Sequence, residues 1–272
     1  MRIPVLTYHA STVGGHDYHN NDHVALAEDL CLIHDLGFRV VPMIDVIDHM
    51  LGRASHDLTN AVVLSCDDGC NLEVTDVEYP GIGWQSSFLS ILKQAHADFG
   101  GQPNMTSFVI ADPNARQKMD EVCLHGQDWM SDDWWHGVQF DNYISIESHG
   151  WDHNHAVLGT TGFDDMQTGS FFEVNCYERA TYQVEQSLDF INQRIKPSYC
   201  RLFAYPYGHV PDYLKLDYFP GNAARLGLDA AFSTEPGYIT KNSDRWNLPR
   251  YVCGWHWKST EELKHILLGS QQ

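Results

Sequence analysis

Short apolar runs alternate along this chain with segments in which apolar residues recur every three or four positions. The apolar runs predict buried strands at residues 4–9, 38–43, 61–65, 105–110, 143–148, 201–205 and 228–233. The periodic segments predict helices at residues 23–37, 44–51, 84–100, 177–195 and 260–268. Ser259 and Glu262 form a capping box at the start of the last helix.

Strands without polar alternation, separated by helices, indicate a parallel sheet that is covered by helices. An open doubly wound sheet and a closed barrel both satisfy this pattern. No Gly-x-Gly-x-x-Gly sequence follows the first strand, which argues against a dinucleotide-binding sheet. The sequence therefore predicts the α/β class but does not decide whether the sheet stays open or closes into a barrel.

The composition narrows the class of protein further. The chain has 272 residues, of which 43% are hydrophobic, so we expect one domain spanning 1–272 with a substantial core. A formal net charge of −19 argues against nucleic-acid partners and against adhesion to anionic lipid surfaces. The N-terminal residues 1–11 lack the apolar run of a secretory signal, and no stretch is long and apolar enough to span a membrane. We therefore expect a cytoplasmic protein.

Polar groups capable of chemistry follow four of the predicted strands. His9 follows the first, Asp67 and Asp68 follow 61–65, His149 follows 143–148, and the sequence Tyr-Pro-Tyr-Gly at 205–208 follows 201–205. In parallel α/β folds the working residues lie just beyond the C-terminal ends of the strands. A purely structural sheet has no reason to carry this arrangement, so we expect a single site there.

His149 and His153 are separated by three residues, a spacing that can bring two imidazoles onto one divalent cation. A carboxylate from elsewhere would complete a three-ligand site of the catalytic zinc type. Asp67 and Asp68 leave their strand in different directions, so we expect one of them to be a ligand and the other a general base. Taken alone, the acidic pair also fits a turn in which one Asp caps the next helix.

Cysteines offer a different interpretation of the acidic pair, because Cys66 and Cys70 flank it and could supply thiolate ligands. However, Cys66 should point opposite to Asp67 along the strand. The seven cysteines contain no Cys-x-x-Cys pair, so neither a disulfide framework nor a zinc ribbon is supported. We expect Cys66 to be a packing residue, and the role of Cys70 stays open.

Three motifs, in order, resemble those of the polysaccharide deacetylases of carbohydrate esterase family four. They are Ser-Cys-Asp-Asp-Gly at 65–69, His-Gly-Trp-Asp-His at 149–153 and Tyr-Pro-Tyr-Gly at 205–208, and the strand at 105–110 is similar to a family strand as well. The resemblance covers most of the chain. It implies a distorted (β/α)7 barrel and an enzyme that removes an N-acetyl group from an amino sugar or an N-acetylated glycan.

The same resemblance implies a role for each residue of the motifs. Asp67 would be the general base, and Asp68, His149 and His153 would bind one divalent metal ion. Zinc is the expected metal, with cobalt and nickel as alternatives. The backbone N–H of Tyr207 would stabilise the oxyanion.

Two histidines are candidates for the general acid. His265, in Leu-Lys-His at 263–265, matches the family's Leu-x-His motif but lies inside the predicted final helix. The N-terminal Tyr-His and the sequence Phe-Ala-Tyr-Pro-Tyr-Gly at 203–208 resemble a permuted branch, the poly-N-acetylglucosamine deacetylase-like members. We therefore expect His9, rather than His265, to protonate the leaving amine.

The chain departs from the family pattern at several positions. Arg201 lies too far before Pro206 for the usual Arg-x-Pro-Tyr spacing, so Arg250 is the expected partner of Asp67. Cys66 replaces an aromatic residue and Gly150 replaces Ser or Thr. Residues 70–84 form a long insertion, which we expect to act as a lid or a substrate-contacting loop.

Two rival functions remain compatible with the sequence. The same site could open another C–N bond, such as that of an N-formyl sugar or a small cyclic amide, and the missing secretory signal favours this version. A non-catalytic carbohydrate-binding protein could also keep the fold. Such a protein, however, does not need all five of the acidic and histidine side chains, which are His9, Asp67, Asp68, His149 and His153. The oligomeric state cannot be inferred from the sequence.

Overall fold

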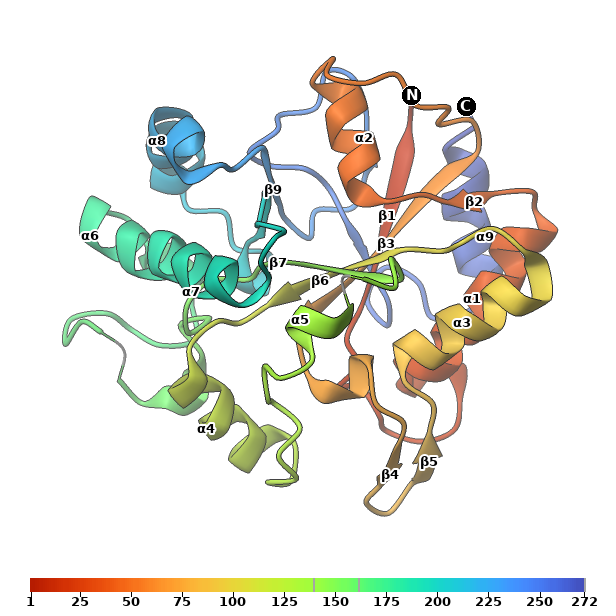
Figure 1. Cartoon of the computed structure of the whole chain (residues 1–272), viewed down its shortest axis with the longest axis horizontal. Helices are drawn as coiled ribbons and strands as arrows, with labels where there is room; N and C mark the ends of the chain where they lie inside the picture. Colours follow the sequence, from red (N-terminus) through yellow and green to blue (C-terminus); the bar gives the residue numbers. More distant parts are fainter. Residues whose placement is uncertain (139, 161, 272) are drawn as a thin grey trace.

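A sheet of parallel strands forms the centre of the protein (Figure 1). The structure, a computed structural model, describes residues 1–138, 140–160 and 162–271. The strands lie in the order β1 (Ile3–Tyr8), β3 (Ala61–Asp68), β6 (Met105–Val109), β7 (Ile144–Ser148), β8 (Leu202–Ala204) and β9 (Ala230–Phe232). Two short strands join this path, since β2 (Arg39–Val40) pairs with β3 and β10 (Tyr238–Ile239) pairs antiparallel with β1.

The two ends of the sheet are joined through residues 248–252. Leu248 forms a parallel bridge with Phe232 of β9, and β11 (Tyr251–Val252) pairs parallel with β1. This segment therefore takes the seventh place in a ring with β1, β3, β6, β7, β8 and β9. The distorted barrel implied by the motifs is confirmed, and the open doubly wound sheet is not formed.

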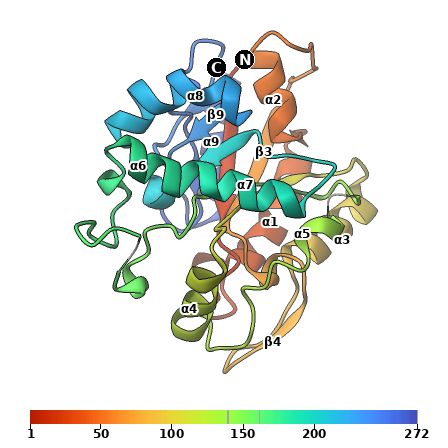
Figure 2. The same cartoon turned by 60° about the vertical axis from the view of Figure 1, so that its left-hand side comes forward.

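Helices pack around the barrel. They are α1 (Asp22–Asp35), α2 (Met43–Met50), α3 (Phe88–Phe99), α4 (Pro113–Cys123), α5 (Trp135–Val138), α6 (Tyr177–Ala180), α7 (Gln186–Arg194), α8 (Phe219–Leu226) and α9 (Thr260–Gly269). Figure 2 shows α6 and α7 as one nearly continuous rod across the strands, and a π-helical turn, Thr181–Glu185, joins them. As predicted, the Ser259 hydroxyl caps α9 by accepting a hydrogen bond from the backbone N–H of Glu262 at 3.3 Å.

Alternate side chains of the strands enter two different hydrophobic clusters, as the two-residue period of a strand requires. In β3, the side chains of Leu64 and Cys66 belong to the cluster that includes buried side chains of α1 and α3. Val63, on the opposite face, packs with Phe108 and with residues of α2 in the second cluster. Asp67 lies on the same face of β3 as Val63, and Cys66 lies on the same face as Leu64. The side chains of Asp67 and Cys66 therefore leave β3 on opposite faces, as predicted.

The structure corrects the prediction in the inserted region. The helix predicted over 84–100 begins too early, because Trp84 lies in β5 (Gly83–Gln85), which pairs antiparallel with β4 (Val77–Tyr79). The helix starts only at Phe88, where the hydroxyl of Ser87 accepts from the backbone N–H of Ser90. Propensity within the segment could not reveal a partner strand that lies earlier in the chain.

No helix in the described part of the chain is long and apolar enough to cross a membrane.

Candidate active site

A cavity of about 320 Å³ lies where several strands of the barrel end. It is lined by His9, Asp67, Asp68, His149, His153, His155, Tyr207, Gly208, Thr234, Val252 and Trp255. These residues follow or end β1, β3, β7, β8, β9 and β11, which are far apart in the sequence. The fold thus brings six of the seven predicted site residues into one cavity, and the seventh, Arg250, contacts Asp67.

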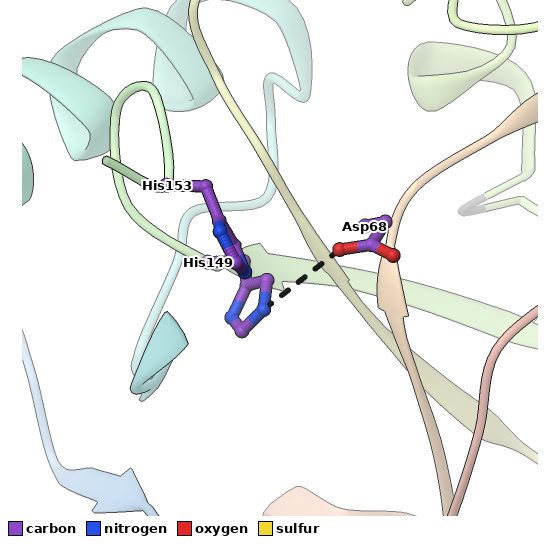
Figure 3. Close-up of side chains that lie close together, drawn as sticks. All are labelled: Asp68, His149 and His153. Atoms are coloured by element: carbon purple, nitrogen blue, oxygen red, sulfur yellow. Dashed lines mark ion pairs between the residues drawn. The ribbon is translucent and has the colours of Figure 1, made fainter. Parts of the chain in front are cut away.

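Asp68, His149 and His153 gather closely enough to share one ion. One potential ligand atom from each lies within 4.8 Å of the others, and this is the one such group among the described residues (Figure 3). His149 Nδ1 donates to the carbonyl oxygen of Ala204 at 2.9 Å, because a carbonyl can only accept. This hydrogen bond leaves the Nε2 lone pair facing the Asp68 carboxylate, 4.0 Å away.

The protonation of the two histidines suits a cation. Burial lowers the pKa of His149 and lowers that of His153 well below its ordinary value, so both rings are neutral at pH 7. His153 Nδ1 is also buried without a hydrogen-bond partner among the described residues, a costly arrangement. Two neutral imidazoles, one carboxylate and an unsatisfied ring nitrogen fit a divalent metal ion.

The loop that carries His153 is held by a buried network that the motif comparison did not single out. Asp152 accepts from the backbone N–H of Asn154 at 2.8 Å and from the side-chain amide of Gln183. Gln183, on the π-helical turn, accepts in return from the Trp151 amide at 3.2 Å. This support matters because His153 adopts a positive φ of 62°, which is uncommon for a residue other than glycine.

Gly150, the position at which family members carry Ser or Thr, belongs to the same loop. Its φ is 85°, a backbone conformation that side-chain-bearing residues rarely adopt. The departure noted in the sequence therefore has a backbone reason, because this loop turns through a left-handed conformation at this position.

Arg250 and Asp67 form a bidentate ion pair inside the barrel. The Arg250 Nη1 and Nη2 atoms lie 2.7 and 2.8 Å from the two Asp67 carboxylate oxygens, and Arg250 is fully buried. Its Nε donates to the carbonyl of Ser233 at 3.0 Å, which fixes the plane of the guanidinium. Burial alone raises the pKa of Asp67, but the charge and hydrogen bonds of Arg250, together with the nearby His149, outweigh burial, and the pKa falls well below its ordinary value. Asp67 is therefore ionised at any physiological pH.

A buried arginine that the sequence interpretation missed shapes the backbone beside Asp68. Arg116 of α4 donates to five backbone carbonyls, including those of Asp68 at 3.2 Å and Gly69 at 2.7 Å. Asp68 has a φ of 80°, and a Cβ on Gly69 would lie 2.5 Å from a methyl carbon of Val109. The glycine of the motif is therefore required by packing, while Arg116 satisfies the carbonyls that this turn exposes. No local pattern in α4 signals that role.

The structure separates the two histidines proposed as general acid. His9 follows β1, its backbone N–H donates to the Asp22 carboxylate at 2.7 Å, and its side chain lines the cavity. His265 lies on α9 with its side chain 76% exposed, 3.8 Å from Glu261. The cavity contains His9 and not His265.

Tyr207 lies in a tight turn, Pro206–Gly208, with a φ of 59°. In the described part of the chain, its backbone N–H has no hydrogen-bond acceptor. A Cβ on Gly208 would lie 1.9 Å from the Thr234 hydroxyl, so this position also requires glycine. The turn thus leaves one amide donor free at the edge of the cavity, beside His153, whose ring lies 4.3 Å from that of Tyr207.

Neither cysteine beside the acidic pair joins the candidate metal group. Cys66 and Cys70 are buried, and burial raises the pKa of both thiols, which disfavours the thiolate form. Near Cys66, the buried Glu73 accepts a 2.5 Å hydrogen bond from Ser107, and burial raises the pKa of Glu73 to about 8. The side chains of residues 70–84, including the β4–β5 hairpin, do not line the cavity, and the role of this insertion as a lid or a substrate-contacting loop stays a prediction.

Comparison with solved structures finds this fold in deacetylases. The Streptococcus pyogenes deacetylase PplD in complex with acetate matches with a TM-score of 0.66 and 19% identity over 98% of both chains. A de-N-acetylase from Aggregatibacter actinomycetemcomitans matches with a TM-score of 0.66 and 16% identity, covering 98% of this chain and 100% of the other. IcaB from Ammonifex degensii matches with a TM-score of 0.63 and 14% identity, over 100% and 97%.

No family model matches the chain. No curated protein matches it in sequence either. The likeness therefore lies in the fold, which these three structures, two of them described as deacetylases, share over nearly their whole length. The resemblance predicted from the motifs is confirmed at this level: the chain has the barrel fold of de-N-acetylases.

Proposed function

We propose that the chain, as one catalytic domain spanning 1–272, is a metal-dependent hydrolase that removes the N-acetyl group from an amino sugar or an N-acetylated glycan. The observation that carries the proposal is the group of Asp68, His149 and His153, set beside an ionised Asp67 in one cavity. The fold agrees with this assignment, because similar structures are those of deacetylases, one of them in complex with acetate.

Asp68, His149 and His153 would hold the metal, with zinc expected and cobalt or nickel as alternatives. A divalent cation there would lower the pKa of a water molecule and polarise the substrate carbonyl. The buried imidazoles line the cavity in which the amide would meet this cation.

The remaining residues handle the protons and the developing charge. Asp67, kept ionised by Arg250, accepts the proton of the attacking water; its Oδ2 lies 3.8 Å from His149 Nε2, next to the ligand group. The free Tyr207 N–H donates to the carbonyl oxygen as negative charge develops on it. His9 donates a proton to the departing nitrogen, so that the amine leaves as a neutral species.

The proposed role of His9 gives a prediction. Replacing His9 with Ala removes the proton donor, and we expect kcat to fall by about 10²–10⁴-fold. Replacing His265 with Ala removes an exposed ring on α9, and we expect activity within about twofold of the wild type, because surface substitutions rarely disturb a distant site. Steady-state kinetics of both variants on one N-acetylated substrate decides between them. The opposite pattern would assign the general acid to His265.

Two measurements on the purified protein test the metal and the substrate class: elemental analysis of its metal content and an assay of its hydrolytic activity. We expect about one divalent ion per chain and release of acetate from oligomers of N-acetylglucosamine. Dialysis against a chelator should abolish the release, and adding back zinc, cobalt or nickel in turn should restore it. N-formylated sugars and small cyclic amides are assayed in parallel. Faster turnover of these would move the assignment to another C–N bond, and a protein without metal or activity would indicate a carbohydrate-binding relative.

A further inference from the structure

A large aromatic side chain stands exposed at the cavity. Trp255 is 71% exposed, whereas His149 and Asp67 in the same cavity are 2% and 4% exposed. Among the exposed large hydrophobic side chains in the described part of the chain, Trp255 alone lines this cavity. Single exposed aromatic side chains are common on protein surfaces, but the position of this one at a polar cavity places it where a bound ligand would contact it.

The turn that presents Trp255 is fixed by backbone hydrogen bonds. The Trp255 and His256 amides donate to the Val252 carbonyl at 3.2 and 2.8 Å, and the Gly254 amide donates to the Trp257 carbonyl at 2.9 Å. Gly254, with a φ of 74°, supplies the left-handed conformation that the turn needs.

Two further contacts tie this turn to the barrel. The Cys253 amide donates to the carbonyl of Thr7 on β1 at 2.9 Å, two residues before His9. The Trp257 ring is fully buried, and its Nε1 donates to Asp29 at 3.1 Å. The turn that carries Trp255 is therefore attached to β1, the strand that His9 follows.

The indole has a neighbouring ring on one side. The Trp255 ring stacks on that of His256, with the ring centroids 5.6 Å apart and the planes 6° from parallel. His256 is itself oriented, because its Nδ1 accepts from the Val252 backbone N–H at 2.7 Å. This stacking leaves the other face of the indole for a ligand.

We propose that Trp255 is a platform for a second sugar ring of the substrate, so that the enzyme acts on a glycan of at least two units. This inference rests on the proposed function and names its substrate class. The amide that reacts must reach the buried ligand group, so the ring that carries it occupies the cavity. The neighbouring ring then lies at the exposed mouth, against the indole. The apolar face of a pyranose packs on an aromatic plane without needing charge, which suits an uncharged N-acetylated glycan and an acidic protein.

The test compares Trp255→Ala with Tyr199→Ala, a matched control. Tyr199 is also exposed, at 59%, but it precedes β8 and so lies at the other end of the strands from the site. On tetramers of N-acetylglucosamine, in β-1,4- and β-1,6-linked forms, we expect Trp255→Ala to lower kcat/KM about 10-fold, through KM, with kcat unchanged. On the N-acetylglucosamine monomer, which has no second ring to place against the indole, we expect a clearly smaller loss than on the tetramers. Trp255→Phe should keep part of the effect, and Tyr199→Ala should match the wild type.

A binding measurement separates this inference from the proposed function. Tetramer is titrated into the metal-depleted protein and followed by isothermal titration calorimetry, with Trp255→Ala expected to bind about 10-fold more weakly. If the wild type hydrolyses the tetramer but Trp255→Ala behaves like Tyr199→Ala in both assays, the platform is refuted and the proposed function stands. If the wild type binds through Trp255 but hydrolyses no N-acetylated substrate, the platform stands and the proposed function fails.

Discussion

Replacing Asp68 with Asn should remove metal and activity together, whereas replacing Asp67 with Asn should remove activity and leave the metal bound. Asp68 supplies the one carboxylate of the ligand group, and an amide oxygen carries no charge to hold a divalent cation beside two neutral imidazoles. Asp67 lies next to this group but is paired with Arg250. Replacing Asp67 therefore removes the proton acceptor and keeps the metal ligands. We expect its kcat to fall by about 10²–10⁴-fold.

Elemental analysis and thermal unfolding distinguish the two variants. A ligand that binds only the folded state stabilises it by about 2.7 kcal/mol at 100 times its Kd, so added zinc should raise the Tm of the wild type and of Asp67→Asn. The Tm of Asp68→Asn should not respond. Asp189→Asn, at an exposed position of α7, serves as the control and should behave like the wild type. Retained activity in Asp67→Asn, or loss of its metal, would contradict the assigned roles.

Replacing Arg250 with Gln should destabilise the fold by about 3–5 kcal/mol, because it leaves the Asp67 carboxylate buried without its partner. The effect should depend on pH in a definite direction. In the wild type, the lowered pKa of Asp67 contributes stability that is present above the unfolded-state pKa of about 4 and is lost as the pH falls toward the folded-state value. In the variant, burial raises the pKa of Asp67, so stability is lost as the pH rises above about 4.

The difference in unfolding free energy between wild type and Arg250→Gln should therefore widen from pH 4.5 to pH 8, measured by urea denaturation. Combining Arg250→Gln with Asp67→Asn removes both charges, and we expect the double variant to recover much of the stability but none of the activity. Lys93→Gln, which breaks a solvent-exposed pair with Asp141, should change stability far less. If the two buried substitutions are instead additive in the double variant, the pair is not coupled, and the proposed control of Asp67 by Arg250 is wrong.

Much of the fold followed from the sequence because its signals are local. The unbroken apolar runs indicated parallel strands covered by helices, and the predicted N-cap Ser259 does start α9. The second half of the predicted capping box differs, because the Glu262 carboxylate accepts from the Lys258 amide rather than from that of Ser259. The β4–β5 hairpin was missed for the opposite reason. Its strands are only three residues long, and the pairing of Val77 with Gln85, rather than the propensity of either strand, defines it.

The candidate site was also partly visible before the structure. The positions of His9, Asp67, Asp68 and His149 at strand ends predicted that they would meet, since the C-terminal ends of parallel strands share one edge of the sheet. The supports were not visible: Arg116, Asp152 and Gln183 act through backbone contacts that no spacing reveals. Trp255 was one of several tryptophans in the sequence, and only its exposure at the cavity distinguishes it.

The sequence by itself determined which chemical groups lie at the strand ends. Strand patterns and motif spacings involve only residues that are close together in the sequence, so they can be recognised without the structure. Tertiary structure decided which groups meet. Arg201 pairs with Asp229 and Asp48, away from the site, while Arg250 reaches Asp67 across 183 residues. That contact exists because residues 248–252 close the barrel between β9 and β1. Closure depends on the packing of the whole ring, and no local stretch of sequence carries that information.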